Sequence, residues 1–307
     1  MIFDVIIIGG GPAGITAGIY AKRAGRSVAI IEKYMPGGQL NLIGEIENYT
    51  GFKSISGAEL AMKFYEHAKS LDIPFFTEEV VGLQLSEKIK TIKCRKNTYQ
   101  AYSVILALGS HPRELKIDGE EKFKGKGVSY CALCDGNFFK NKSVAVVGSG
   151  DSAVSDALYL ADICLKVFVL TKEKLKLHNY SESELASFKN ISVLKGAYSK
   201  AIEGENKLER LVFVQNEKEK EIDVDGIFVA IGRTPDTDLL KGEVELNEQG
   251  YIKSDANMRT SQEGVFVCGD VREGNIKQIA CAVGDGAIAG TEASKYAIKT
   301  RITSSLN

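Results

Sequence analysis

The chain has 307 residues, a length that allows about two domains of ordinary size. Its 39 Lys and Arg nearly balance 40 Asp and Glu, so the formal net charge of −1 argues against nucleic acid or an anionic membrane as a partner. No apolar run approaches the roughly 18 residues that span a bilayer, and the first residues lack the features of a secretory signal peptide. We expect a cytoplasmic protein that acts on small molecules or other proteins.

The N-terminal segment carries a dinucleotide-binding pattern. Residues 3–8 are, apart from Asp4, apolar and largely β-branched, as in a strand buried on both faces of a parallel sheet. A glycine-rich turn, a helix over 15–24 and a second strand over 27–31 should follow. Glycines at this spacing let a phosphate approach the start of the helix, and an acid after the second strand can meet a ribose hydroxyl. The residues of this first site are Gly9, Gly11, Gly14 and Glu32.

The same pattern returns in the middle of the chain. Residues 143–147 predict a strand, 148–153 a glycine-rich turn, 154–161 a helix and 167–170 the next strand. A duplication of this kind predicts two nucleotide-binding-type domains. Further apolar segments that end in glycine, typical of strands, are residues 104–109 and 226–232.

The C-terminal section predicts a strand over 264–270 and a helix over 279–298, without a nucleotide turn of its own. We therefore expect it to complete the first domain. The predicted fold class is α/β, with two Rossmann-like domains of which the second is inserted into the first. The first domain would comprise residues 1–112 and 242–307, and the inserted domain residues 113–241. The charged run at 216–221 is typical of a solvated hairpin tip.

Two cysteines with two residues between them, Cys131 and Cys134, are followed directly by Asp135. In a reducing compartment such a pair is more often catalytic or metal-binding than structural. Half of a zinc site is the main alternative to a redox dithiol. The chain offers no second pair, and its histidines are single and far apart, so we predict redox chemistry and no metal. The remaining cysteines, expected to be unreactive, are Cys94, Cys164, Cys268 and Cys281.

Several motifs, taken in order, resemble the low-molecular-weight thioredoxin reductases from residue 1 to about residue 296. They are Pro36-Gly37-Gly38-Gln39-Leu40, Glu47-Asn48-Tyr49-Thr50-Gly51-Phe52, Cys131-Ala132-Leu133-Cys134-Asp135-Gly136, and Cys268-Gly269-Asp270 with Gln278 and Ile279.

This resemblance implies FAD as the cofactor, thioredoxin as the partner and a homodimer formed through the FAD domain. The residues implied to bind FAD are Gly9, Gly11, Pro12, Ala13, Gly14, Glu32, Gly38, Gln39, Leu40, Asn48, Gly109, Gly269, Asp270, Gln278 and Ile279.

The resemblance also implies roles for the cysteine pair. Cys134 would face the flavin, and Cys131 would exchange with the protein substrate. Asp135 can move a proton to or from a thiolate, which completes the predicted catalytic set. Because a dithiol packed against the flavin would be hidden from a partner, the inserted domain should swing between half-reactions, with hinges over 108–114 and 236–242.

The family pattern breaks at residues 171–177. The usual enzymes have His-Arg-Arg with another Arg four residues on, where this chain has Thr-Lys-Glu-Lys-Leu-Lys-Leu, and Ser155 replaces a common Glu. Guanidinium groups bind phosphate bidentately, lysines do so less specifically, and Glu173 repels it. The glycines of this turn do not decide the matter, because a tight strand-to-helix turn needs them even when empty.

Three interpretations of this second site remain. The lysines could hold NADPH by charge, the site could prefer NADH, or it could bind no nicotinamide. We favour the last, because the chain resembles a branch of thioredoxin reductase-like flavoenzymes that takes electrons from reduced ferredoxin, and NADPH is therefore doubtful. A different class of function, a flavin redox sensor in which Cys131 and Cys134 switch without turnover, also fits the sequence, as does reduction of another disulfide such as that of a peroxiredoxin domain.

Overall fold

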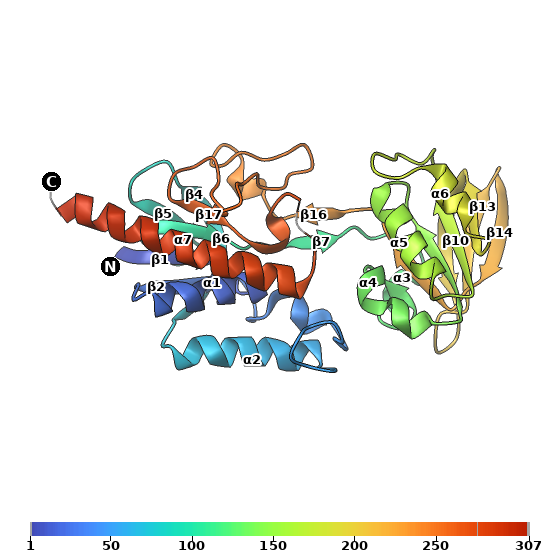
Figure 1. Cartoon of the computed structure of the whole chain (residues 1–307), viewed down its shortest axis with the longest axis horizontal. Helices are drawn as coiled ribbons and strands as arrows, with labels where there is room; N and C mark the ends of the chain where they lie inside the picture. Colours follow the sequence, from blue (N-terminus) through green and yellow to red (C-terminus); the bar gives the residue numbers. More distant parts are fainter. Residues whose placement is uncertain (1, 275, 306–307) are drawn as a thin grey trace. The chain divides into compact units, whose positions relative to one another are not determined.

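The computed structural model describes residues 2–274 and 276–305, with side chains to residue 303. The chain divides into two compact units (Figure 1). The first runs to His111 and resumes at Thr234, and the second comprises Pro112–Arg233. The two connections between the units contain β7 (Ser110–Pro112) and β16 (Arg233–Pro235), which pair as a two-stranded sheet.

The second boundary lies earlier than the predicted one at 241/242. Residues 234–241 belong to the first unit, because Leu240 of the short helix η3 (Asp238–Leu240) is fully buried in the core of that unit with Ile252 and Val271. The Thr237 hydroxyl also donates to the Gly250 carbonyl at 2.7 Å. The segment expected to be the second hinge, 236–242, therefore packs within the first unit.

The main sheet of the first unit explains its apolar strands. Val5 and Ile7 pack in one hydrophobic cluster and Ile6 and Ile8 in another, so β1 is buried on both faces. The strand order is β3-β2-β1-β6-β5-β4, with β17 beside β6; β1, β2, β3, β6 and β17 are parallel, and β4 and β5 add an antiparallel edge. The bounds are β1 (Ile2–Ile8), β2 (Val28–Glu32), β3 (Phe75–Thr77), β4 (Val80–Gln84), β5 (Lys90–Cys94), β6 (Thr98–Leu106) and β17 (Val265–Val267).

Two helices of the first unit pack closely through glycine. A Cβ on Gly286 would lie 2.3 Å from the Ala13 carbonyl oxygen, and one on Gly290 would lie 2.4 Å from that of Ala17. Only glycine permits this approach of α7 to α1, and Figure 1 shows the two helices side by side. The helices of this unit are α1 (Pro12–Arg23), α2 (Gly57–Ser70) and α7 (Ile279–Ser305), with the 3₁₀ helices η1 (Gly38–Leu42) and η4 (Gly269–Val271).

The second unit is built on a parallel sheet in the order β11-β10-β9-β15-β8, with an antiparallel sheet β12-β13-β14. Side chains of α5 and β9 share one hydrophobic cluster, and the opposite face of β9 packs with β13. The bounds are β8 (Val128–Ser129), β9 (Ser143–Val147), β10 (Lys166–Thr171), β11 (Ile191–Lys195), β12 (Ala197–Glu203), β13 (Arg210–Gln215), β14 (Lys218–Asp223), β15 (Gly226–Val229), α3 (Glu120–Phe123), α4 (Ala132–Asp135), η2 (Gly136–Phe139), α5 (Asp151–Ala161) and α6 (Glu182–Ser187).

The predicted α/β class is confirmed, and most differences lie at element ends. The predicted strand over 264–270 is only Val265–Val267 before η4, and the C-terminal helix continues to Ser305. The charged run forms a hairpin whose two turn residues, Asn216 and Glu217, have φ of 52° and 61°.

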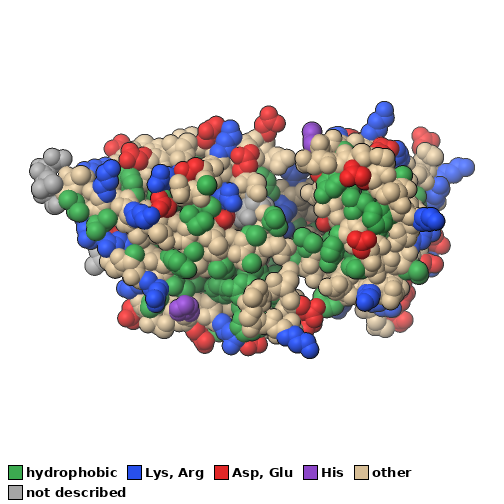
Figure 2. All heavy atoms as spheres, viewed as in Figure 1, with side chains coloured by type: hydrophobic (Ala, Val, Ile, Leu, Met, Phe, Trp, Pro, Cys, Tyr) green, Lys and Arg blue, Asp and Glu red, His purple; other side chains and the backbone are tan. Residues whose placement is uncertain are grey.

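The surface matches the balanced charge of the sequence. Figure 2 shows acidic and basic side chains interspersed over the visible face. Within the described residues, no helix is both long enough and apolar enough to cross a membrane.

Candidate active site

The glycine-rich turn after β1 is shaped to receive an anion. A Cβ on Gly9 would lie 2.3 Å from the Ala107 carbonyl oxygen, and one on Gly14 would lie 1.9 Å from that of Gly9, so close packing requires both glycines. A Cβ on Gly11 would meet nothing within 4 Å. Gly11 caps the N-terminus of α1 without a side-chain hydrogen bond, and Pro12 follows. Open space at uncapped backbone N–H groups suits a phosphate.

The predicted ribose-binding acid lies beside this turn. The Glu32 carboxylate accepts from the Gly10 N–H at 2.6 Å and from the Tyr34 N–H at 3.0 Å. The end of β2 thus places a carboxylate next to the phosphate cradle, as the dinucleotide fold requires.

The segment containing Gly38, Gln39 and Leu40 joins the same region. A Cβ on Gly38 would lie 3.3 Å from the Gly11 Cα, and Leu40 is buried. The Gln39 side-chain amide donates to the Ser110 carbonyl. This bond ties η1 to the chain after β6, where the predicted Gly109 has φ +74°.

The C-terminal members of the predicted site also converge here. The Asn48 amide donates to the Gln278 side chain at 3.1 Å, and a Cβ on Gly269 would lie 2.8 Å from the Ala13 Cβ. Ile279 begins α7 and packs against the cluster that contains Leu40. The predicted cofactor residues therefore all belong to the first unit, and these contacts link its separate segments. The glycine cradle, the carboxylate and the amides fit FAD.

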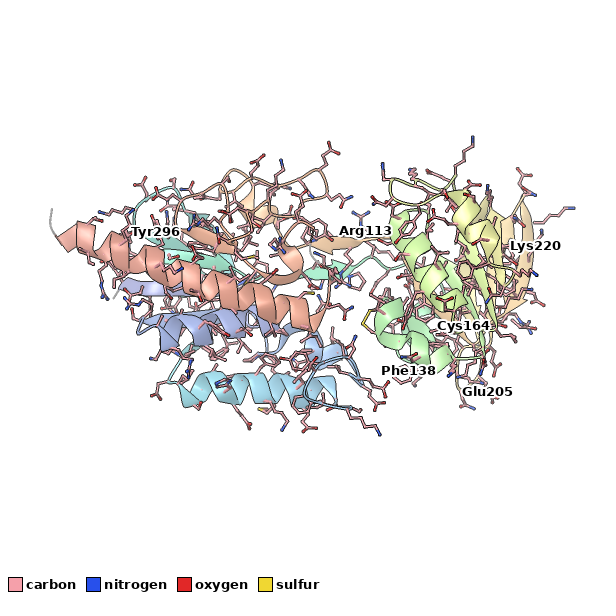
Figure 3. All side chains as sticks on the ribbon, in the orientation of Figure 1. Arg113, Phe138, Cys164, Glu205, Lys220 and Tyr296 are labelled. Carbon is pink, nitrogen blue, oxygen red and sulfur yellow. A yellow bond between two sulfur atoms is a disulfide. The ribbon has the colours of Figure 1, made fainter. Side chains whose placement is uncertain are left out.

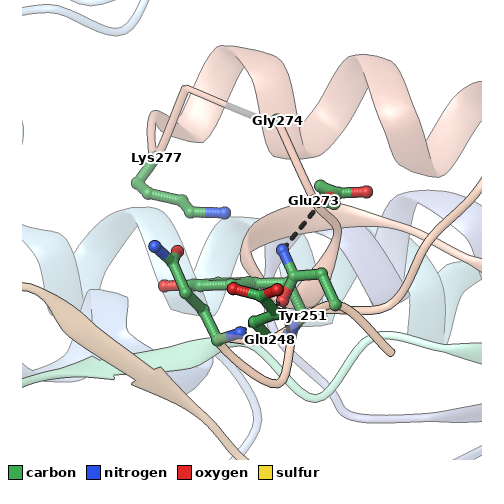
Figure 4. A pocket seen from close by; sticks show the side chains of 7 residues that line it. Glu248, Tyr251, Glu273, Gly274 and Lys277 are labelled. Atoms are coloured by element: carbon green, nitrogen blue, oxygen red, sulfur yellow. Dashed lines mark hydrogen bonds between the residues drawn. The ribbon is translucent and has the colours of Figure 1, made fainter. Parts of the chain in front are cut away.

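Lys277 is a residue of this region that the sequence analysis missed. Its ammonium donates to the carbonyls of Asp270 at 2.8 Å and Arg272 at 3.1 Å, and lies 4.5 Å from the centroid of the Tyr251 ring. It thus joins η4 to the start of α7, both of which carry predicted FAD residues. Its one sequence signal is its place directly before Gln278. A pocket of about 510 Å³ lies beside it, lined by Asn247, Glu248, Gln249, Tyr251, Glu273, Gly274 and Lys277. Figure 4 shows the residues that line this pocket.

A partly buried ion pair fixes the turn that carries Asp270. The Asp285 carboxylate accepts from the Arg272 Nε at 3.0 Å and from the Gly269 N–H at 3.1 Å. Cys268, next to this turn, is fully buried, and burial raises the pKa of its thiol. A thiol that stays protonated packs here without reacting.

The cysteine pair lies in the second unit and forms a disulfide, with the two Cα atoms 5.3 Å apart (Figure 3). Cys131 caps α4, and its sulfur accepts from the Cys134 N–H at 3.2 Å. Between them, Ala132 is buried and Leu133 is 51% exposed. The short helix is therefore anchored on one side while its other side presents the residue between the two sulfurs.

Asp135 is held by a residue that the sequence analysis did not identify. The Ser129 hydroxyl donates to the Asp135 carboxylate at 2.5 Å. Burial raises the pKa of Asp135, and the bond from Ser129 opposes that rise. Ser129 lies at the end of β8, six positions before Asp135, and belongs to no spacing that marks a site.

Two of the other thiols are poor nucleophiles because they are buried. Cys94 and Cys164 are buried, and burial raises the pKa of each to about 11. Cys281 on α7 is partly exposed. Across residues 2–274 and 276–305, no group of three or more His, Cys, Asp and Glu could hold a metal ion.

The second glycine-rich turn makes the same close backbone contact as the first, although Gly148 lacks the positive φ of Gly9. A Cβ on Gly148 would lie 2.3 Å from the Ala230 carbonyl oxygen, and one on Gly150 would meet nothing within 4 Å. The Asp151 carboxylate at the start of α5 accepts from the backbone N–H groups of His178 at 2.9 Å and Asn179 at 3.1 Å.

The segment that follows β10 runs along this turn. The Lys176 N–H donates to the Ser149 carbonyl at 2.7 Å. The Lys176 ammonium pairs with Glu173 at 2.8 Å, and both side chains are exposed, as are Lys172 and Lys174. One of the three lysines thus already has a carboxylate partner.

Comparison with known proteins identifies the family to which the chain belongs. The pyridine nucleotide-disulphide oxidoreductase family matches residues 3–286. The thioredoxin reductase of Bacillus subtilis (strain 168) is 38% identical over 299 residues, covering 96% of this chain and 95% of its own. The chain belongs to the low-molecular-weight thioredoxin reductase family. It is therefore an oxidoreductase, and membership implies a flavin cofactor, FAD.

Two solved structures resemble the fold. The thioredoxin reductase from Streptococcus pyogenes MGAS5005 has a TM-score of 0.91 and 37% identity, covering 97% of this chain and 99% of that one. A ferredoxin-flavin thioredoxin reductase from Clostridium acetobutylicum has a TM-score of 0.53 and 33% identity, covering 95% and 97%.

Proposed function

We propose that this protein reduces the disulfide of a thioredoxin, with electrons passing from FAD to the Cys131–Cys134 pair. The observation that carries the proposal is the disulfide on α4, with Leu133 exposed between its sulfurs, in a chain whose first unit contains a cradle for FAD. When bound, FAD supplies the electron pair that opens this disulfide.

The reduced pair then acts by thiol–disulfide exchange. The Cys131 thiolate attacks one sulfur of the thioredoxin disulfide and forms a mixed disulfide, releasing the other thioredoxin sulfur. The Cys134 thiolate next displaces thioredoxin and restores the Cys131–Cys134 disulfide. Thioredoxin gains the electron pair that the dithiol loses. Asp135 serves as the proton carrier for the thiols, since it directly follows Cys134 and burial raises its pKa.

We infer that reduced ferredoxin is the electron donor. The segment after β10 lacks arginine, and the Glu173–Lys176 pair weakens its attraction for a 2′-phosphate. The Clostridium acetobutylicum protein with 33% identity is named for ferredoxin. NADPH or NADH is the alternative, favoured by the open space at Gly150 and the exposed Lys172 and Lys174.

Donors offered one at a time test this function. Purified flavin-containing protein and thioredoxin are mixed with reduced ferredoxin, NADPH or NADH, and thioredoxin thiols are measured. We expect turnover with reduced ferredoxin alone. Turnover with NADPH or NADH would contradict the assignment of ferredoxin as the donor. If no donor supports turnover although dithiothreitol still opens the disulfide, the result would favour a redox sensor. A colourless protein would overturn the whole proposal.

We further propose a cytoplasmic homodimer formed through the first unit. The dimer follows from the family resemblance, and light scattering on the purified protein tests it. The four cysteines other than Cys131 and Cys134 are free thiols, which fits a reducing compartment.

A further inference from the structure

The Ser129 hydroxyl contacts both the first redox cysteine and the acid that follows the second. Ser129 is 5% exposed. Its oxygen lies 2.5 Å from the Asp135 Oδ2, 3.3 Å from the Cys131 carbonyl oxygen and 3.1 Å from the Cys131 nitrogen, whose N–H it accepts. One buried hydroxyl therefore connects the backbone of Cys131 with the carboxyl group of Asp135.

The hydrogen-bonding capacity of this hydroxyl allows two arrangements. A serine oxygen has one hydrogen and two lone pairs, and the Cys131 N–H takes one lone pair. When Asp135 is ionised, the hydroxyl hydrogen points to the carboxylate. When Oδ2 carries a proton, it donates to the second lone pair, and the hydroxyl hydrogen turns to the Cys131 carbonyl. The Cys131 carbonyl also accepts from the Asp135 N–H at 3.1 Å. Every one of these polar groups therefore has a partner in both states, and neither state leaves one of them unsatisfied.

We propose that Ser129 is a positioning residue that lets Asp135 take up and release a proton beside the redox pair, by turning its hydroxyl between Asp135 and Cys131. The inference rests on the proposed function, in which Asp135 exchanges protons with the dithiol. In the forward step a proton leaves the Asp135 Oδ2 for a thiolate sulfur, so that an O–H bond breaks and an S–H bond forms. The resulting carboxylate then accepts a hydrogen bond from the Ser129 hydroxyl. No electrons move in this step.

The titration of Asp135 must be distinguished from that of other titratable groups near α4. The elements that pack against α4 are α5 and η2, and β15 pairs with β8; η2 and β15 carry no titratable side chain. On α5, Asp156 is partly buried, and burial raises its pKa to about 6. Three other titratable groups lie on or near these elements: Asp151, Tyr159 and Tyr130. Asp151 accepts from the backbone N–H groups of His178 and Asn179, and the Tyr130 hydroxyl donates to Glu120 at 2.8 Å.

Infrared spectroscopy on the full flavin-containing chain tests the proposal. The C=O stretch of protonated carboxyl groups is followed against pH, with the disulfide closed and after reduction by dithiothreitol, and the Asp135 band is the one that Asp135→Asn removes. Ser129→Ala should raise the midpoint of this band by about one pH unit, because the ionised carboxylate loses its hydroxyl donor. Ser129→Thr keeps the hydroxyl and should restore the original midpoint. Asp156→Asn, the matched control, should leave it unchanged.

An unchanged or lowered midpoint in Ser129→Ala would overturn the proposal, and so would an equal shift in Ser129→Thr. If Ser129→Ala does not fold, Ser129→Cys replaces it, since a thiol is a weaker donor and should also raise the midpoint. The measurement needs neither thioredoxin nor ferredoxin, NADPH or NADH, because dithiothreitol reduces the disulfide. Absence of turnover would therefore count against the proposed function alone, and an unshifted band against the role of Ser129 alone.

Discussion

The two glycine-rich turns of this protein make similar close contacts and differ in their surroundings. A Cβ on Gly9 or on Gly148 would lie 2.3 Å from a backbone carbonyl oxygen, so neither position accepts a side chain. Gly11 and Gly150 each face open space. The first turn opens α1 with an uncharged proline and has Glu32 beside it. The second opens α5 with Asp151. The turn itself is thus a requirement of the strand-to-helix connection, and the ligand is decided by the side chains around it.

The largest expected effect concerns the two units, of which the first is proposed to bind FAD and the second contains the Cys131–Cys134 pair. Cys134→Ser should lower thioredoxin reduction by about a thousandfold or more, because the disulfide can no longer form. Its FAD content should stay unchanged, since the predicted FAD residues lie in the first unit. Turnover with a thioredoxin assay and the flavin absorbance are measured on the same sample. Cys164→Ser is the control, and loss of activity there would contradict the assignment.

The second prediction uses the equivalent turns directly. Gly14→Ala should weaken FAD binding by roughly a hundredfold, because its Cβ would lie 1.9 Å from the Gly9 carbonyl oxygen and push the cradle apart. Gly150→Ala, where the added Cβ meets nothing within 4 Å, is the control in the second turn and should retain FAD. Fluorescence titration of the apoprotein with FAD measures both. Equal losses in the two variants would show that FAD does not depend on the first turn.

A third prediction concerns the helices that follow the turns, because α5 carries a partly buried acid and α1 carries none. Burial raises the pKa of Asp156 to about 6. Between the usual aspartate pKa of about 4 and this value, the folded state binds a proton that the unfolded state does not, so stability falls as pH rises through this window. Asp156→Asn should therefore raise the free energy of unfolding by about 2 kcal/mol near pH 8 and change it little near pH 4.

Urea unfolding at both pH values measures this effect. Asp162→Asn, an exposed acid at the end of the same helix, is the control. If the free energy of unfolding depends on pH equally in Asp156→Asn and in the original chain, the burial of Asp156 has no such energetic effect.

The smallest expected effect tests why the second turn differs. Glu173→Arg removes a repelling charge, releases Lys176 from its ion pair and adds a guanidinium, so NADPH binding should tighten roughly tenfold. Glu182→Arg breaks a comparable exposed pair with Lys195 in the same unit and is the control. Calorimetry with NADPH measures both. Tight NADPH binding by the original chain would remove the contrast between the two turns.

The sequence predicts the parts of this molecule that depend on local pattern. Apart from Asp4, residues 3–8 are apolar, and residues 5–8 of the resulting strand are buried on both faces. The glycine spacing marks both turns. The boundary near residue 241 was misplaced because the burial of Leu240 depends on contacts with Ile252 and Val271, distant in sequence.

Ser129 and Lys277 were missed for a related reason. Each acts through atoms that folding brings together, a carboxylate six residues away and two backbone carbonyls, respectively. Neither residue type stands out at its position, because serine and lysine are common on surfaces and only their contacts distinguish them. Distances between atoms, which no spacing rule contains, were needed to find them.

An anaerobic reductive titration followed by flavin absorbance tests the central claim most directly. If electrons pass between FAD and the Cys131–Cys134 disulfide, the original protein should take up one electron pair for the flavin and a second for the disulfide, and Cys134→Ser should take up the flavin pair alone. Equal uptake by the two proteins would contradict the account.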